Sequence, residues 1–149
     1  MSSKYKAILA ALESGLAGIS TAAGYNTDVA RVYRTPQNVM NIPRLPALIL
    51  GDGDEEPEPE TNATYRSTLR LPLVGVVASD TDVKHEGLAS DAVHDLLQDV
   101  KNWLDANQGL GLSYVDWAYL KEIGVYTAGN RAFFNSVVEV QYWYTRGNA

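Results

Sequence analysis

The chain has 149 residues, of which 46% are hydrophobic and 20% are charged, and it contains no cysteine. This length is typical of one globular domain that can build a core without disulfides or a structural metal. The lack of cysteine excludes a disulfide scaffold, a thiolate zinc site, an iron–sulfur cluster and a cysteine nucleophile.

The formal net charge of -6, from 18 acidic and 12 basic residues, is confined to one segment. Residues 51–60 read GDGDEEPEPE and hold six acids and no base, so the remaining chain carries 12 acids against 12 bases. The six acids are Asp52, Asp54, Glu55, Glu56, Glu58 and Glu60. A balanced remainder argues against a basic, nucleic-acid-binding face.

The N-terminal segment is predicted to be part of the fold. Its apolar residues between 4 and 17 recur at helical spacing, and Glu13 and Ser14 interrupt them, so an amphipathic helix fits better than a signal peptide. The longest apolar run, 71–78, is far shorter than the roughly 20 residues of a membrane-spanning helix. We therefore expect a cytosolic protein with no membrane partner.

The next segments predict a short strand and then an irregular region. After a glycine-containing turn, apolar and polar residues alternate over 29–33, as in a strand. Three prolines between 35 and 46 exclude a helix or an inner strand, because each removes a backbone donor. We expect 35–46 to be a long exposed loop or an extended arm.

A short apolar strand is predicted over 47–50, directly before the acidic segment. Two glycines, two prolines and six like charges predict that 51–60 is a solvated, mobile loop. The longest strand is predicted over 64–78, where Pro72 and Gly75 indicate a bulge or an edge position.

The C-terminal half predicts one helix and one hairpin. Between 82 and 107 the apolar residues recur at three and four, which indicates a long helix with its N-cap at Ser79, Asp80 or Asp82. Residues 113–146 predict two long strands joined by a turn at 128–130.

The predicted fold is therefore α+β, a single domain with a mainly antiparallel, mixed sheet of about four to five strands and two helices packed on one face. Loops at about 35–46 and 51–63 are expected to project from it. The other face of the sheet must be polar or be covered by something else.

No pattern of residues points to catalysis, and we expect no enzyme, no metal and no cofactor. His85 and His94 lie half a turn out of phase on a helix and cannot share a metal there. The acidic segment departs from a calcium-binding loop, because Pro57 stands where that loop needs glycine, which leaves at most weak association with divalent cations. No nucleophile-elbow sequence is present.

Aromatic residues gather in the predicted hairpin, where nine of the chain's 14 lie between 114 and 144. Such a number exceeds what one helix-covered face could easily hide, and tryptophan and tyrosine favour protein interfaces. Strands also favour aromatics, so about half of them can be core. Besides the six acids, the candidate contacts with a partner or a ring neighbour are Val39, Met40, Arg44, Trp117, Tyr119 and Trp143.

Five segments in chain order give the sequence a recognisable layout. They are KYKAILAALESGLAGI (4–19), AAGYNTDVARVYR (22–34), LPALIL (45–50) before a variable loop, DAVHDLLQDVKNWL (91–104) and VVEVQYWYTR (137–146). This layout resembles the tail terminator (tail completion) proteins of long-tailed bacteriophages. The resemblance spans nearly the whole chain and lies in arrangement and length.

The resemblance implies a structural role in a virion. Subunits of that family form a hexameric ring at the head-proximal end of the tail tube, stop the polymerisation of the tube protein and later join the head–tail connector. It implies assembly in the host cytoplasm, location in the phage tail, a sheath protein as partner if the tail is contractile, and passage of DNA without sequence-specific binding. By position, 35–46 and 51–60 would dock to neighbours.

A channel through which DNA slides should not bind phosphate tightly. We therefore expect the acidic segment to face either the DNA passage or a basic patch on a neighbour, and deletion of 52–60 to leave the fold intact.

Three alternatives stay open. The chain could be another phage neck, head–tail joining or minor tail protein. It could be a monomeric acidic adaptor that binds a host protein through 51–60. An enzyme would require a polar pocket that gathers groups such as His94, Asp95 and Asp91, which the helical pattern instead spreads along a solvated face.

Overall fold

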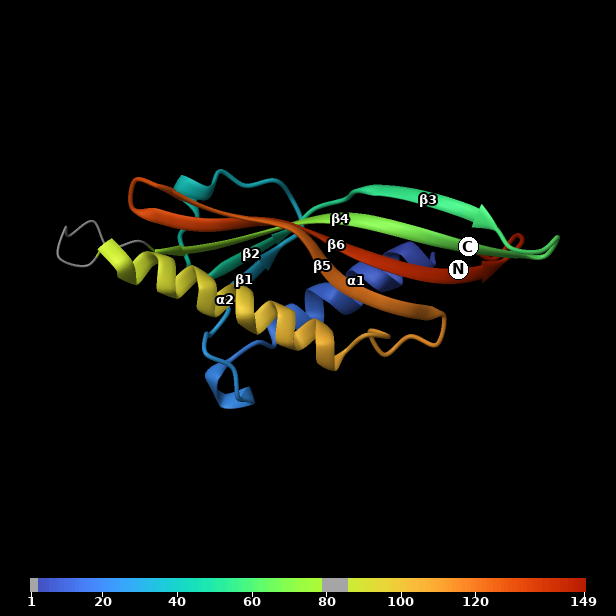
Figure 1. The fold of residues 1–149 in the computed structure, drawn as a ribbon, viewed down its shortest axis with the longest axis horizontal. Coiled ribbons are helices and arrows are strands. Elements are labelled where there is room, and N and C mark those ends of the chain that lie inside the picture. The colour runs from blue at the N-terminus through green and yellow to red at the C-terminus, as the bar shows by residue number, and fades with distance from the viewer. Residues whose placement is uncertain (1–2, 79–85) are drawn as a thin grey trace.

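The computed structural model describes residues 3–78 and 86–149, which form one mixed sheet with two helices (Figure 1). The helices are α1 (Lys4–Ala17) and α2 (Glu86–Ala106). The strands are β1 (Arg31–Tyr33), β2 (Ala47–Leu50), β3 (Asp54–Pro59), β4 (Thr64–Ala78), β5 (Val115–Ala128) and β6 (Arg131–Thr145).

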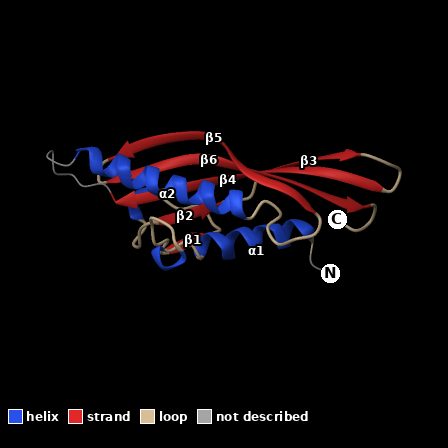
Figure 2. Ribbon diagram, turned by 60° about the horizontal axis from the view of Figure 1, so that its bottom comes forward, coloured by secondary structure: helices blue, strands red, loops and turns tan. Residues whose placement is uncertain are grey.

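The strand order is β1-β2-β4-β6-β5, and β3 also pairs with β4. The β1–β2 pair is parallel and all other pairs are antiparallel. The predicted α+β class is confirmed, with six strands in place of four to five. Both helices lie on the same face of the sheet (Figure 2).

The core lies between this face and the helices. Alternate leucines of β4 (Leu69, Leu71 and Leu73) are fully buried there. The buried helix residues are Ile8, Leu9, Leu12 and Leu16 of α1 and Val93, Leu96, Leu97, Val100 and Leu104 of α2. The helices approach closely, since a Cβ on Gly15 would lie 1.8 Å from the Trp103 ring. Within the described ranges, neither helix is long and apolar enough to span a membrane.

Strand β4 is an inner strand, so the predicted bulge or edge position is wrong. It pairs with β6 along its whole length without a register shift, and its other side pairs with β3 over 65–70 and β2 over 73–76. The irregularity lies in the neighbour, at residues 51–53. Gly51 N donates to Pro72 O at 2.9 Å, so Pro72 still accepts a ladder bond from the neighbouring chain although it has no N–H to donate in return.

The acidic segment is exposed, as predicted, but it is not a loop: residues 54–59 form β3. Gly53 makes the pairing feasible, because a Cβ there would lie 1.7 Å from the Arg70 carbonyl oxygen. Glu60 N donates to Thr64 O at 2.9 Å, so alternate residues from 60 backward bond to β4. Pro57 and Pro59 fall on the other positions, whose backbone faces outward, and an edge strand tolerates proline there.

The 35–46 segment lacks regular structure apart from a single turn at Val39–Asn41, as its prolines predict. It does not project, however. It folds back over one end of the sheet face opposite the helices, where Ile42 is buried against Tyr33, Ile49 and Val76. Apolar residues among the prolines therefore give this segment a covering role.

The other predictions for the C-terminal half also stand. The hairpin turns at residues 129–130, and α2 carries the expected apolar stripe. His85 and the proposed N-cap residues Ser79, Asp80 and Asp82 lie outside the described residues.

A buried carboxylate fixes the loop before β1 to α2. Asp99 accepts from the backbone N–H groups of Asn26 at 3.0 Å and Thr27 at 2.8 Å, as well as from both of their side chains. A buried charge is stable only when it is fully hydrogen-bonded, and here the loop supplies the donors.

We predict that Asp99→Ala lowers the free energy of unfolding by about 2–3 kcal/mol, because several buried donors lose a charged acceptor. Urea denaturation measures this loss. Asp95→Ala, at an exposed position of the same helix, serves as the control and should change stability by less than about 0.5 kcal/mol. Equal losses in the two variants would contradict the pinning role of Asp99.

Candidate interaction surface

The face of the sheet opposite the helices is covered by 35–46 at one end, and its other half carries polar and aromatic side chains. Residues paired across neighbouring strands share a face. The register therefore places three cross-strand rows on this half: Asp54, Arg70, Glu139 and Tyr119; Glu56, Thr68, Gln141 and Trp117; and Glu58, Arg66 and Trp143. We call these residues, with Lys121 in the adjoining row, the open face.

Ion pairs link the strands of the open face. Glu139, whose side chain is 11% exposed, lies 3.0 Å from Lys121 Nζ and 3.9 Å from Arg70 Nε. Arg70 also lies 3.8 Å from Glu56. The Tyr119 hydroxyl and the Glu139 carboxylate raise the pKa of Lys121. Exposed pairs add little stability individually, so this network chiefly fixes the charge pattern of the surface.

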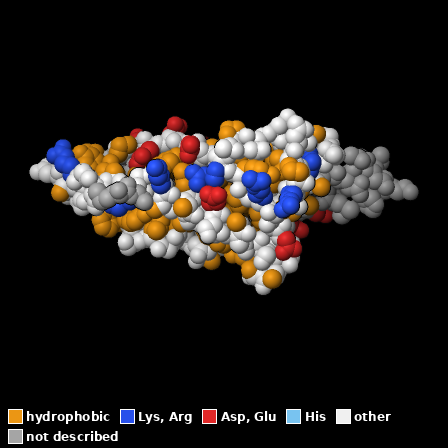
Figure 3. Space-filling model, turned by 180° about the vertical axis from the view of Figure 1, so that it is seen from behind, with side chains coloured by type: hydrophobic (Ala, Val, Ile, Leu, Met, Phe, Trp, Pro, Cys, Tyr) orange, Lys and Arg blue, Asp and Glu red, His pale blue; other side chains and the backbone are white. Residues whose placement is uncertain are grey.

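Arg66 forms two further ion pairs on this half of the sheet. Its guanidinium lies 3.2 Å from the Glu60 carboxylate and 3.2 Å from that of Asp116. Asp116 lies at the start of β5, on the far side of β6 from Arg66. Asp54 and Glu58 form no ion pair within the described residues. The open face thus carries both signs with an excess of acid. Figure 3 shows one side of the molecule, where basic, acidic and hydrophobic side chains are interspersed.

Aromatic side chains occupy the same half of the sheet. The rings of Trp117 and Tyr119 lie 4.5 Å apart, and Lys121 Nζ lies 4.9 Å from the Tyr119 ring centre. Trp143 is 37% exposed. Large aromatic residues and arginine are enriched at protein interfaces, whose rims are polar.

A second apolar patch lies at the hairpin end of β6. Met40 is 40% exposed and Tyr126 is 51% exposed. Met40 Cε lies 3.1 Å from the position of a Cβ on Gly129, next to the hairpin turn, and the Tyr126 ring lies 5.6 Å from that of Phe133. This apolar patch and the aromatic side chain of Trp143 therefore lie at opposite ends of β6.

An apolar hollow lies between the covering segment and strands β2 and β4. Its volume is about 270 Å³, and Pro36, Val39, Ile49 and Val74 contribute to its walls. Val39 is thus part of this hollow, whereas Arg44 is exposed and forms no ion pair within the described part of the chain.

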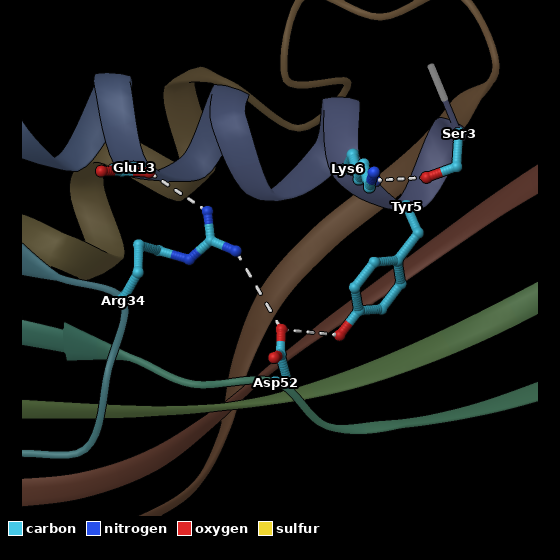
Figure 4. Close-up of polar contacts among 6 residues, drawn as sticks. All are labelled: Ser3, Tyr5, Lys6, Glu13, Arg34 and Asp52. Atoms are coloured by element: carbon cyan, nitrogen blue, oxygen red, sulfur yellow. Dashed lines mark hydrogen bonds and ion pairs between the residues drawn. The ribbon is translucent and has the colours of Figure 1, made fainter. Parts of the chain in front are cut away.

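The structure divides the six acids of the acidic segment among three environments. Asp54, Glu56 and Glu58 lie on the open face, on the same side as Trp117, Tyr119 and Trp143, and Glu60 pairs with Arg66. Asp52 accepts from the Tyr5 hydroxyl at 3.2 Å and lies 4.0 Å from Arg34 (Figure 4). Glu55 points to the helix side of the sheet.

Glu55 is held by two hydroxyl groups on that side. It accepts from Ser67 Oγ at 2.7 Å and from the hydroxyl of the buried Tyr142. The Tyr144 ring lies 5.8 Å from that of Tyr142 and stacks on Tyr65 at 5.3 Å. Burial, followed by the hydrogen bond to Glu55, raises the pKa of Tyr142 well above its ordinary value.

Three of the candidate residues, Trp117, Tyr119 and Trp143, lie together on the open face, whereas Lys121 and Glu139 were not among the candidates. A signal existed for Glu139, since an acid in the otherwise apolar run 137–140 suggests a specific partner. Its partners could not be named without the register of β5, which shifts twice against β6.

The described residues contain no group of three or more histidines and acids placed to hold a metal. His94, Asp91 and Asp95 are exposed on α2. The sequence matches no protein-family model, and comparison with curated proteins gave no match. The surface chemistry itself is therefore the guide to function.

The Tyr142 hydroxyl predicts a pH dependence of stability. The pKa of this hydroxyl is higher in the folded chain than the value of 10.0 expected after unfolding. Its full contribution to the free energy of unfolding is therefore present below about pH 10. Above that pH the unfolded chain loses the proton first, and stability falls as pH rises. We predict that Tyr142→Phe is less stable at pH 7 but loses less stability between about pH 9.5 and 11.5.

Urea denaturation at several pH values tests this dependence. Tyr126→Phe, which removes an exposed hydroxyl, is the control and should follow the wild-type curve. An alkaline decline that is as steep in Tyr142→Phe as in the wild type would overturn the assignment.

Proposed function

We propose that this chain is a structural subunit of a bacteriophage tail, a terminator that forms a hexameric ring at the head-proximal end of the tail tube. In this role it ends polymerisation of the tube protein and provides the joint to the head–tail connector, with a sheath protein as a further neighbour if the tail is contractile. The observation that carries the proposal is the open face, where Trp117, Tyr119 and Trp143 lie beside paired charges with no covering element from the described chain.

A ring requires two different contact surfaces on each subunit, because the contact between neighbours in a ring is heterologous. The aromatic patch around Trp143 and the apolar patch around Met40 and Tyr126 differ in chemistry and lie at opposite ends of β6. Such an arrangement supports head-to-tail contact between copies. The layout of the sequence, which resembles tail terminators over nearly its whole length, supports the same role.

Charge supports the placement of the acids toward DNA or toward a basic neighbour. The open face has more acids than bases, and a DNA passage must avoid tight phosphate binding. Asp54 and Glu58 are the best placed to act outward, because their charges are not neutralised by an ion pair within the described residues.

The expectation that residues 52–60 could be deleted without damage to the fold is wrong. The deletion would remove β3, expose one side of β4 and take away the acceptor of Ser67 and Tyr142. Neutralising single outward charges is a cleaner test of what the segment does.

We predict that Asp54→Asn combined with Glu58→Gln reduces tail joining by roughly ten-fold, through weaker electrostatic complementarity, and leaves the melting temperature nearly unchanged. The yield of infectious particles in a complementation assay measures this effect. Asp95→Asn with Asp105→Asn removes the same charge from exposed positions of α2 and should have no effect. Equal yields from both pairs of variants would remove the acids from the proposal.

We also predict that the chain forms rings, and that Trp143→Ala with Trp117→Ala weakens their assembly at least ten-fold, because central tryptophans commonly contribute about 2 kcal/mol or more to an interface. Light scattering gives the mass, and electron microscopy gives the shape. Gln98→Ala, on the exposed side of α2, is the control. Unchanged assembly in the tryptophan variant would exclude the open face from the ring contact.

Images of particles made without the protein separate the proposed role from its alternatives. Loss of a terminator gives tails of uncontrolled length. Tails of normal length without heads would instead identify a neck or head–tail joining protein. Normal particles, together with a monomer in solution, would favour an adaptor that acts on a host protein.

A further inference from the structure

A pocket of about 390 Å³ opens on the helix side of the sheet, beside the first residues of α1. In this region β3 and the adjoining ends of β4 and β6 extend past the helices (Figure 2). The volume of the pocket lies within the range of small-ligand sites. The lining residues are Ser3, Tyr5, Glu55, Pro57, Tyr142, Tyr144 and Ala149. Among the described residues, one acidic side chain and three tyrosines thus line one cavity, and no lysine or arginine does.

The two oxygens of Glu55 differ in their partners. Oε1 accepts both from Ser67 Oγ at 2.7 Å and from the Tyr142 hydroxyl. Oε2 accepts no hydrogen bond from the described residues, and Glu55 forms no ion pair with them. One oxygen therefore fixes the carboxylate, and the other is available for a donor.

The tyrosines make the pocket aromatic as well as negative. The Tyr142 and Tyr144 rings lie 5.8 Å apart, and the Tyr65 ring stacks on that of Tyr144 at 5.3 Å. Burial and the charge of Glu55 raise the pKa of Tyr144. For Tyr5, burial raises the pKa and the nearby charge of Asp52 adds to this. Aromatic faces with a carboxylate attract a cation through the ring quadrupole and the full charge together.

We propose that this pocket receives the side-chain ammonium group of a lysine from a partner protein. The ammonium would donate to Glu55 Oε2, and its apolar stem would lie against Pro57 and the tyrosine rings. Arginine fits less well, because its preferred bidentate contact needs both carboxylate oxygens, and here Oε1 already accepts two hydrogen bonds.

The chain's own nearby lysine has other partners. Lys4 Nζ donates to the Asn148 carbonyl oxygen at 2.7 Å and lies 5.3 Å from the Tyr114 ring centre. It does not line the pocket. The cation is therefore supplied from outside the described chain.

The edge of β3 favours insertion of a side chain over addition of a strand. Pro57 and Pro59 lie at positions whose backbone faces outward, so two of the outward donors of this strand are missing. A partner strand could not form a continuous ladder here. The pocket beside that edge offers a contact that needs no strand pairing.

The test uses the full-length chain and Nα-acetyl-lysine methylamide as the probe. We expect saturable shifts of the backbone amide signals of Glu55 and Tyr142 in two-dimensional NMR, with a dissociation constant on the order of 1–10 mM. Glu55→Gln should weaken binding at least ten-fold, because its amide can keep the two hydroxyl contacts but cannot offer a charged oxygen. Glu58→Gln makes the same chemical change on the open face and should bind as the wild type does.

A second probe checks the role of the ammonium charge. The Nε-acetylated form of the same lysine derivative has the same stem without the charge and should cause no saturable shift. Binding that persists in Glu55→Gln, binding of the acetylated probe, or no saturable shift with the first probe would each overturn the proposal. These outcomes concern a single subunit, so they are independent of ring formation and of the role in a tail.

Discussion

The alternation of side chains along β4 is the constraint on which the other features of the structure depend. Leu69, Leu71 and Leu73 point to the helices, whereas Arg66 and Arg70 point away. Burying each leucine contributes about 1.5–3 kcal/mol, so a slip of one residue would both expose the leucines and bury the arginines. The register with β6 repeats the same division, which puts Val138 and Val140 in the core and Glu139 on the open face.

This one-sided burial explains why the fold has an open face. Two helices supply enough apolar surface for one side of the sheet, and 35–46 covers one end of the other. The remaining half carries cross-strand ion pairs, which tolerate water and fix the charge pattern of this surface. Because Trp117 and Trp143 lie among these pairs, this half combines the charge pattern and the aromatic area of an interface.

The sequence predicted the elements whose periodicity is set by the core. The apolar stripes of α1 and α2 and the long strand over 64–78 follow directly from repeats of three to four and of two. Strand β3 could not be predicted in this way, because its acids and prolines are unfavourable in strands. Its formation depends on tertiary features: the contact of Gly53 with the Arg70 backbone and an edge position that leaves the prolines facing outward.

The candidate surfaces were predictable to a similar extent. An excess of aromatics in the hairpin pointed to Trp117, Tyr119 and Trp143, but not to the ion pairs that surround them, because those depend on the register. The separation of Glu55 from Asp54 and Glu56 required knowing that the segment is a strand, in which neighbours point to opposite faces. Composition alone treats all six acids as one loop, and the role of Asp99 likewise has no sequence signal.

The central claim is that the open face becomes an interface when the protein assembles. Hydroxyl-radical footprinting of the dilute chain and of the assembled ring, read out by mass spectrometry, tests it most directly. We predict that oxidation of Trp117 and Trp143 falls several-fold on assembly, whereas His94 on α2 is oxidised equally in both states. Unchanged oxidation of Trp143 in the assembled ring would contradict the claim.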